Sequence, residues 1–162
     1  MKLTAFVLAG LLSLPLAVRA EEADRTHFPA KQPPPTGVVA SGAPATASAA
    51  PFSAAVLAGK TLYVSGAIDL DPATGKLGAT PEESAKLALD AVQASVTAAG
   101  MTMDDLVWVQ VFCTDLSYFP KFNTVYRTYF HGPLPARAFL GVDHLLGNAH
   151  FEVMGVAVKK AP

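Results

Sequence analysis

Cysteine and charge are both scarce in this sequence. Cys113 is the only cysteine and cannot form a disulfide within the chain, and no spacing resembles a zinc or iron–sulfur site. Twelve basic residues stand against 13 acidic residues, a balance that argues against binding to polyanions. The sequence also lacks Walker, Rossmann and nucleophile-elbow motifs, so we expect no bound cofactor. Its 162 residues, half of them apolar, fit one globular domain held together by burial.

The first 20 residues have the order that is typical of a signal peptide. Basic Lys2 precedes an uncharged run, Leu3–Val18, and small Ala20 precedes Glu21. The run contains Pro15 and is shorter than the roughly 20 apolar residues that span a bilayer as a helix, which disfavours a retained membrane anchor. We therefore expect cleavage after residue 20 and export to the periplasm, with no membrane association of the mature protein.

The mature chain divides into two parts. Residues 21–35 are polar and then proline-rich, which favours an extended tether. We expect the folded domain to occupy residues 36–162, with a first edge strand at Gly37–Ala40.

Periodicity predicts an α+β fold, a mixed sheet of about six strands covered on one face by two helices. Thr80, Pro81 and Glu83 form a capping box that starts the first helix, and Gly100 suits its end. Ser117 is a candidate cap for the second helix, which we expect to reach Gly132. The remaining strands are expected near residues 54–58, 61–68, 106–114, 138–142 and 150–158.

Several of these strands are apolar on both faces. In the strand that begins near Leu106, for example, Val109 and Val111 alternate with Trp108 and Phe112. Two helices cover only one face of a sheet, and the other would expose an apolar patch larger than a monomer usually tolerates. We therefore expect a homo-oligomer that packs sheet against sheet.

From Pro51 onward the sequence has two arginines, Arg127 and Arg137. Arg127 falls among the exposed positions of its predicted helix, whereas Arg137 lies between apolar neighbours at the start of a predicted buried strand. A planar cation in that setting either pairs with an acidic side chain or binds an anion such as a ligand carboxylate, to which it offers two parallel hydrogen bonds. The structural ion pair is the commoner arrangement.

Glu152 lies in a predicted strand that is apolar on both faces. Desolvation would raise the pKa of an unpaired carboxylate there, as suits a general acid or base. The alternative is an ion pair with Arg137 or Lys159. If the last two strands formed a hairpin turning near Leu146, Glu152 would lie opposite Gly141, roughly 14 Å from Arg137, and the two groups would flank a cleft.

Three further candidates point to chemistry less strongly. His144 and His150 with Asp143 suggest a metal site, but no third strong ligand is nearby, so surface or cleft-rim positions are favoured and we expect no metal. Cys113 has no histidine placed to activate it, which favours a buried apolar role. Asp115 follows the same strand and is expected to cap a turn.

Several short motifs occur in a specific order and spacing. They are Pro51–Ser53, Tyr63–Gly66, Asp71–Gly75, Val111–Leu116, Phe122–Tyr126, Pro135–Arg137 and Phe151–Val153. Together they resemble the RidA family of reactive-intermediate deaminases, also written YjgF/YER057c/UK114, over about residues 39–160.

The resemblance implies a chorismate-mutase-like fold and a homotrimer with its sites in clefts between subunits. It also implies hydrolysis of enamines and imines, typically 2-aminoacrylate and its imine, to 2-oxo acids and ammonia without a cofactor. By position, Arg137 matches the arginine that holds the substrate carboxylate, and Glu152 matches the carboxylate near the attacking water. Ser65, Gly66 and Asn123 match positions that line the family's cleft.

The sequence departs from the family pattern within this cleft. Phe52 stands where the family usually has tyrosine, so one hydroxyl that could hold substrate or water is missing. Ala67 and Ala138 replace polar residues, and Phe139 occupies a position that is commonly smaller. Loss of one positioning hydrogen bond costs roughly 1 to 3 kcal/mol in the transition state, which slows a reaction about ten- to a hundredfold.

We therefore expect a deaminase that acts on small 2-imino or enamino acids outside the cytoplasm. One alternative is a non-catalytic module that binds small carboxylates, favoured by Phe52, Ala138 and export. Another is a chaperone-like interaction protein, favoured by the apolar surface and the tether. Nucleic acid is not an expected partner, because residues 51–162 have eight basic against ten acidic side chains and no basic stripe.

Overall fold

A computed structural model describes residues 25–30 and 50–160, and the account that follows concerns these residues. Its elements are β1 (Arg25–Pro29), β2 (Ser53–Ala58), β3 (Thr61–Ile68), α1 (Pro81–Ala98), β4 (Leu106–Cys113), α2 (Phe119–Tyr126), β5 (Ala136–Gly141) and β6 (Phe151–Val158). Short 3-10 turns lie at Met103–Asp105, Leu116–Tyr118, Arg127–Tyr129 and Leu146–Asn148.

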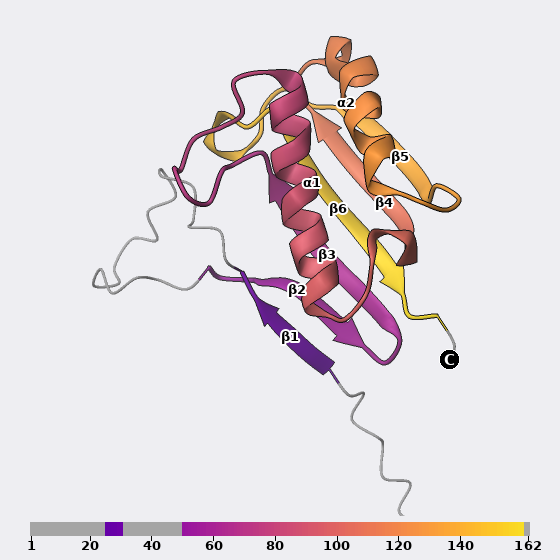
Figure 1. Ribbon diagram of the computed structural model, residues 1–162. Helices are drawn as coiled ribbons and strands as arrows, with labels where there is room; N and C mark the ends of the chain where they lie inside the picture. The colour runs from indigo at the N-terminus through magenta and orange to yellow at the C-terminus, as the bar shows by residue number, and fades with distance from the viewer. Residues whose placement is uncertain (1–24, 31–49, 161–162) are drawn as a thin grey trace, which may run out of the picture.

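The six described strands form one mixed sheet in the order β1-β2-β3-β6-β4-β5. Every neighbouring pair is antiparallel except β4 and β5, which run parallel because α2 forms the crossover between them. Both helices pack on the same face of the sheet (Figure 1). The predicted α+β architecture is confirmed.

Helix α1 begins and ends where local chemistry predicts. The Thr80 side chain accepts a hydrogen bond from the Glu83 backbone N–H, and the Glu83 carboxylate accepts one from the Ala79 N–H. Gly100, just beyond the helix, has a φ of 70°, a left-handed conformation that glycine adopts at little cost. The buried face of α1 comprises Ser84, Ala85, Ala88, Leu89, Val92 and Val96.

The core lies between the helices and one face of the sheet. Val109, Val111, Phe151 and Val153 are fully buried there beneath α1 and α2. The opposite face has apolar side chains in register across the strands, Tyr63 beside Val156 and Val156 beside Trp108. Trp108 is 40% exposed and Tyr63 55% exposed, so this second apolar face is uncovered in the described chain.

The structure tests the sequence expectations for the first 40 residues at one segment. Arg25–Pro29 lies within the predicted tether but forms strand β1, which pairs with β2. The tether prediction is therefore wrong for these residues. They form backbone hydrogen bonds with a strand that is distant in the sequence, and their own polar sequence does not indicate this pairing. The predicted signal peptide, tether residues 21–24 and 31–35 and the expected strand at Gly37–Ala40 lie outside the described residues.

Two other expectations are corrected. Ser117 does not cap a helix: the Asp115 side chain accepts a hydrogen bond from the Ser117 N–H and caps the 3-10 turn before α2, because a carboxylate already stands in the capping place. The last two strands do not form a hairpin either, since β4 lies between β5 and β6.

Within the described residues, no helix has the length and apolarity needed to cross a bilayer.

Candidate active site

Arg137 lies on β5, an edge strand, and its side chain turns toward α2. Its partner in β4 is the buried Val109, so Arg137 occupies the helix-covered face of the sheet. Nη2 donates a hydrogen bond to Asn123 Oδ1 at 2.7 Å. The guanidinium carbon lies 4.5 Å from the centre of the Tyr126 ring and within 6 Å of three further rings, those of Phe119, Phe122 and Phe139.

No acidic side chain of the described chain pairs with Arg137. Its only described hydrogen-bond partner is the neutral amide of Asn123, and Nη1 is buried with no partner at all. Burial lowers the pKa of Arg137, an effect that nearby Tyr126 opposes and Arg127 reinforces, but an arginine still remains charged at physiological pH. The guanidinium therefore keeps free donors in an aromatic surrounding, an arrangement suited to a small organic anion.

Glu152 lies on the opposite face of the sheet, half-buried between β3 and β4. It pairs in register with Ile68 and Phe112, and the buried Phe151 and Val153 on either side of it face the helices. Its carboxylate has no hydrogen bond or ion pair within the described residues, and burial raises the pKa of Glu152. A Cβ on Gly66 would overlap Glu152 Oε1, so glycine at this position leaves room for the carboxylate.

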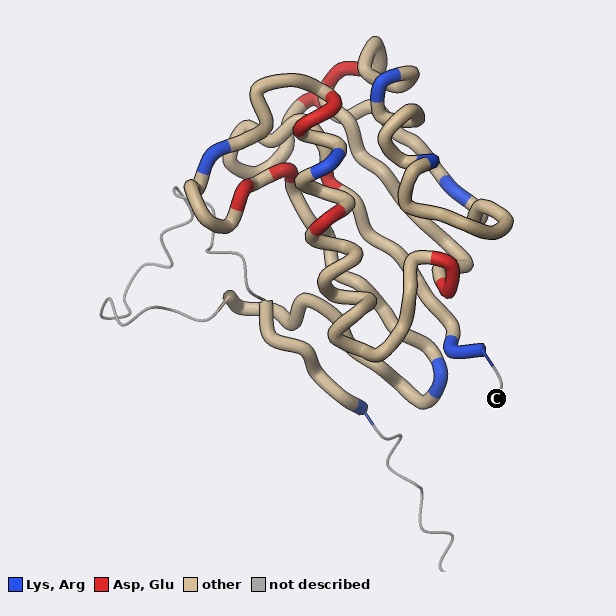
Figure 2. The backbone as a smooth tube through the Cα atoms, viewed as in Figure 1, with Lys and Arg blue, Asp and Glu red and all other residues tan. Residues whose placement is uncertain are grey.

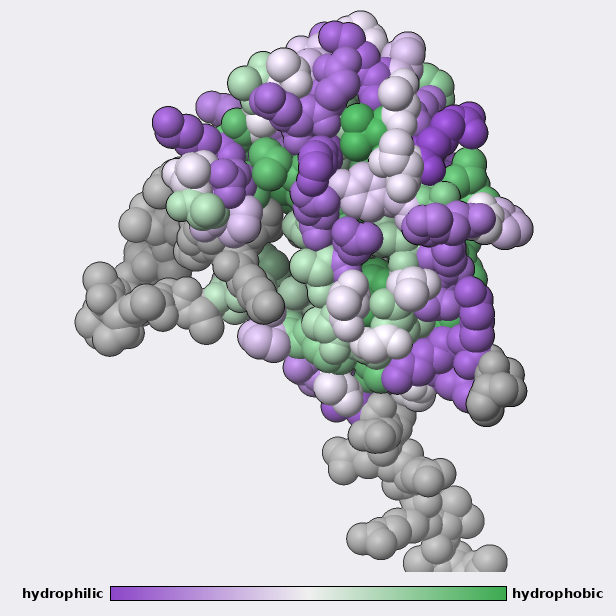
Figure 3. Space-filling model, in the orientation of Figure 1, coloured by the Kyte–Doolittle hydropathy of each residue, from purple (hydrophilic) through white to green (hydrophobic). Residues whose placement is uncertain are grey.

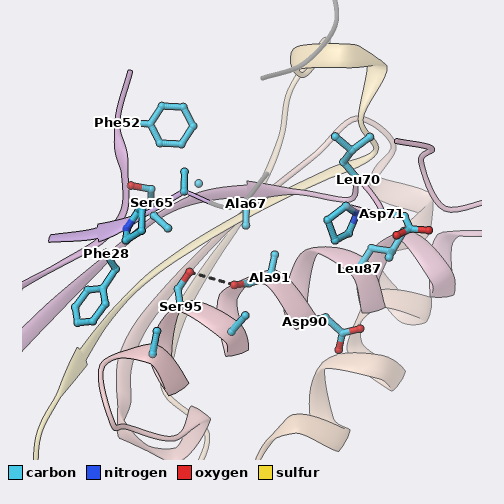
Figure 4. Close-up of a pocket in the computed structure, with 17 residues that line it drawn as sticks. Phe28, Phe52, Ser65, Ala67, Leu70, Asp71, Leu87, Asp90, Ala91 and Ser95 are labelled. Atoms are coloured by element: carbon cyan, nitrogen blue, oxygen red, sulfur yellow. Dashed lines mark hydrogen bonds between the residues drawn. The ribbon is translucent and has the colours of Figure 1, made fainter. Parts of the chain in front are cut away.

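Phe52, Ser65 and Gly66 lie together at an apolar cavity of about 360 Å³. Figure 4 shows Phe52 and Ser65 on the sheet side of this cavity and Ala91 and Ser95 of α1 on the other side. In Figure 3 the hollow opens beside α1 among apolar residues. Ser65 Oγ donates to the Ser53 carbonyl at 2.7 Å, and this bond holds the hydroxyl at the cavity rim.

The candidate residues thus form two groups in one chain. Arg137, Asn123 and Phe139 form the first, and Phe139 packs edge-on against Phe119 at 4.9 Å. The second group is centred on Gly66: Phe52, Ser65 and Gly66 line the cavity beside α1, whereas Glu152 lies next to Gly66 on the opposite face of the sheet. By the strand registers, Glu152 lies two strands away from Arg137 and is displaced by three residues along the strand direction. The two residues are therefore roughly 14 Å apart and on opposite faces. Within the described residues of one chain, Arg137 and Glu152 therefore do not flank the cleft that the hairpin hypothesis placed between them.

Comparison with known proteins assigns the family. The model described as endoribonuclease L-PSP matches residues 42–159, which is most of the chain. The chain belongs to this family, the RidA (YjgF) family.

RidA-family proteins resemble this chain in both sequence and fold. The 2-iminobutanoate/2-iminopropanoate deaminase of Mus musculus is 38% identical over 117 residues, which cover 71% of this chain and 86% of that protein. The crystal structure of E. coli TdcF with bound serine has a TM-score of 0.70 and 29% identity, covering 83% of this chain and 99% of the other. Yeast Mmf1 has a TM-score of 0.70 at 31% identity, covering 85% and 100%.

One polar cluster of this RidA-family chain escaped the sequence analysis. The buried Asp69 carboxylate accepts hydrogen bonds from the backbone N–H groups of His150 and Phe151 and lies 2.8 Å from His150 Nδ1. Ser84 Oγ lies 3.1 Å from the same Nδ1. Ser84 and Asp69 thus both approach Nδ1 of the ring, whereas a catalytic triad needs the aspartate at one ring nitrogen and the serine at the other. The cluster connects the start of α1 to the place in the sheet where β3 ends and β6 begins.

The weaker candidates take structural roles. Cys113 is fully buried, desolvation raises the pKa of its thiol, and its Sγ donates to the Asp115 carbonyl. His150 belongs to the Asp69 cluster, so it shares no site with Asp143 and His144. No group of three metal-ligating side chains occurs in the part of the chain that the structure describes.

Proposed function

We propose that this protein hydrolyses small 2-imino and enamino acids, of the 2-aminoacrylate kind, to 2-oxo acids and ammonia. The observation behind this proposal is Arg137, a half-buried cation with free donors and no acidic partner in the described chain. Relatives named imine deaminases, at 36 to 39% identity, support deaminase activity. The direct test is release of ammonia and 2-oxo acid from freshly generated 2-iminopropanoate, with buffer alone as the control.

The proposed chemistry divides between the two groups of residues. Arg137 holds the planar imino acid by its carboxylate, and Asn123 keeps the guanidinium in place. Glu152 orients a water and accepts its proton as the oxygen adds to the C=N carbon. As the C=N π bond opens, this proton passes to the nitrogen. Glu152 then takes the proton of the new hydroxyl and passes it to the same nitrogen while the C–N bond breaks, which gives the 2-oxo acid and ammonia. An enamino acid reacts after it tautomerises to its imine. No cofactor is needed for these steps.

The proposed site is completed by a second copy of the chain. Arg137 and Glu152 lie on opposite faces, so a substrate held by one cannot reach the other within one subunit. Arg137 stands on edge strand β5, where a neighbour can approach, and Glu152 lies on the uncovered apolar face. We propose a homotrimer that buries this face and places each Arg137 group against the Glu152 group of its neighbour.

The substitution Trp108→Glu is expected to dissociate the assembly. A carboxylate at this position would be desolvated in the proposed interface without a partner, which disfavours association. Light scattering at micromolar concentration should give three times the chain mass for the parent protein and a lower mass for the variant. The control is Leu134→Glu, at a 46% exposed loop position, which should keep the full mass. A parent protein with the mass of one chain would contradict the proposal.

The pH dependence of the reaction should report Glu152. The ionised carboxylate is the form that accepts the proton of water, and burial raises the pKa of Glu152 above its usual value. As the pH falls through this raised pKa, kcat/KM should therefore decrease, and it should do so at a higher pH than an ordinary glutamate would produce. Initial rates between about pH 4 and 8 measure this limb.

The variant Glu152→Gln supplies the matched control for this pH dependence. It should lose most activity and show no acidic limb. A raised carboxyl pKa means that the folded state holds the proton more tightly, so ionisation costs stability as the pH rises. The neutral glutamine should therefore unfold at a higher temperature than the parent at pH 7. An unchanged acidic limb in this variant would assign that limb to another group.

We also propose that the protein is exported. The motivation is the order of charge, apolar run and small residue in the first 20 residues. The mass of the protein recovered from the extracytoplasmic fraction should correspond to a chain that begins at Glu21. Recovery there of protein that still begins at Met1 would reject cleavage.

A non-catalytic module for small carboxylates is the second candidate function. It is favoured by Phe52, 52% exposed at the cavity, which offers no hydroxyl to substrate or water. Binding of 2-oxobutyrate without turnover of 2-iminopropanoate would support it. RNA cleavage, which the family description suggests, lacks an electrostatic basis here, because residues 51–162 have ten acidic against eight basic side chains, and Figure 2 shows acidic as well as basic positions along the described backbone.

A further inference from the structure

Two buried polar atoms without hydrogen-bond partners occur in the described chain, and they belong to residues in contact with each other. One is Nη1 of Arg137, and the other is the hydroxyl oxygen of Tyr126. The Tyr126 ring is the closest aromatic neighbour of the guanidinium, with 4.5 Å between Cζ and the ring centre. A buried polar atom without a partner loses its hydrogen bonds to water and gains none from the protein, so two in one place require an explanation.

Neither atom has a partner within reach on its own element. Tyr126 is 3% exposed in the last turn of α2, beside the stacked ring of Phe122. Asn123, one turn earlier on the helix, already accepts from Nη2 of Arg137. Both groups are therefore buried hydrogen-bond donors for which the described chain provides no acceptor.

We propose that the Tyr126 hydroxyl is a second donor to the substrate carboxylate, beside Nη1 of Arg137. This inference rests on the proposed function and names a substrate-binding residue that the sequence pattern did not single out. A carboxylate between the two groups would satisfy both unpaired atoms and keep its charge next to the cation. It would also replace the hydroxyl that is missing at Phe52.

The protonation state of Tyr126 fits a donor. Desolvation raises its pKa to about 12, an effect that the nearby Arg137 partly opposes, so the hydroxyl keeps its proton at neutral pH. Phe119 is 41% exposed, the most exposed of the four rings around the guanidinium, and lies 5.8 Å from its carbon. We infer that the carboxylate enters past this ring.

The test is calorimetric titration of 2-oxobutyrate into the full-length protein and the variant Tyr126→Phe. The variant keeps the ring beneath the guanidinium and removes only the hydroxyl, so we expect a Kd about tenfold higher or more. The variant should also unfold at a higher temperature, because it loses an unsatisfied buried hydroxyl. Affinity and stability should thus change in opposite directions, which a merely structural role would not produce.

Tyr129→Phe is the matched control. Tyr129 lies three residues further along, and its hydroxyl already donates to Asp90 at 2.6 Å. Its removal should leave 2-oxobutyrate binding unchanged. A second variant, Tyr126→Leu, removes ring and hydroxyl together. If Tyr126→Phe binds like the parent while Tyr126→Leu is weakened, only the ring matters and the proposal is wrong.

Measurement of turnover as well as binding distinguishes failure of this proposal from failure of the proposed function. If the parent protein binds 2-oxobutyrate in a Tyr126-dependent way but does not deaminate 2-iminopropanoate, the carboxylate site stands and the catalytic function fails. If the parent deaminates the substrate and Tyr126→Phe has an unchanged KM and Kd, the function stands and the role of Tyr126 is refuted. A parent protein that does not bind 2-oxobutyrate refutes the role of Tyr126 as well.

Discussion

Replacement of Arg137 with alanine is expected to lower kcat/KM for 2-iminopropanoate by roughly a hundred- to a thousandfold. The guanidinium is the only cation that we place on the substrate carboxylate, and a charge-assisted pair of hydrogen bonds in a dry surrounding is worth several times a neutral one. No acidic side chain of the described chain pairs with Arg137, so the substitution leaves no carboxylate without its counter-charge. The fold should therefore persist, as circular dichroism can check.

Two further variants sharpen this prediction. Arg137→Lys keeps the charge and loses the planar fork, so its activity should lie between those of the parent and the alanine variant. Arg127→Ala removes the other arginine of this region, which is exposed, and should leave kcat/KM within about twofold of the parent. Equal activity in the parent and Arg137→Ala would reject the carboxylate-binding role.

Replacement of Asp69 with alanine is expected to lower the free energy of unfolding by about 3 to 5 kcal/mol. The carboxylate is fully buried and satisfies two backbone N–H groups and the His150 ring, and all three would lose their acceptor. Urea denaturation at one fixed chain concentration measures the loss, since the stability of an oligomer depends on concentration.

Asp71→Ala is the control for this loss. Asp71 lies two residues further on and accepts hydrogen bonds from Ala73 and Thr74 in an exposed turn, so its removal should cost about 1 kcal/mol or less. Asp69→Asn should fall between the two, because the amide retains one acceptor oxygen. A loss of less than about 1 kcal/mol in Asp69→Ala would mean that the cluster does not stabilise the junction between α1 and the sheet.

The secondary structure was largely predictable because its determinants are local. Helix α1 is marked by Thr80, Pro81 and Glu83 at one end and Gly100 at the other, all within a turn of the boundaries that they define. Strand β1 was missed because the sequence Arg25–Pro29 is polar, and its partner in β2 lies about 30 residues away. Local patterns do not record such a partner.

The candidate site was only partly predictable. Arg137 and Glu152 stood out because each is a charged residue in an apolar strand, and the structure shows both without a described ionic partner. Tyr126 and Asp69 gave no such signal, since a tyrosine in an apolar helical stripe and an aspartate beside a turn are both ordinary. The spacing of Tyr126 three residues after Asn123 could have placed both on one face of α2.

By itself the sequence determined the types and approximate positions of the two helices and of strands β2 to β6, their apolar faces, and the two charged anomalies. Caps, turns and alternation act between residues a few positions apart, so the chain records them directly. Only the tertiary structure decided that β4 separates β5 from β6, that Arg137 and Glu152 face opposite sides, and that Asp69 meets His150 across 81 positions. Those relations depend on strand order and register, which follow from packing the whole core at once.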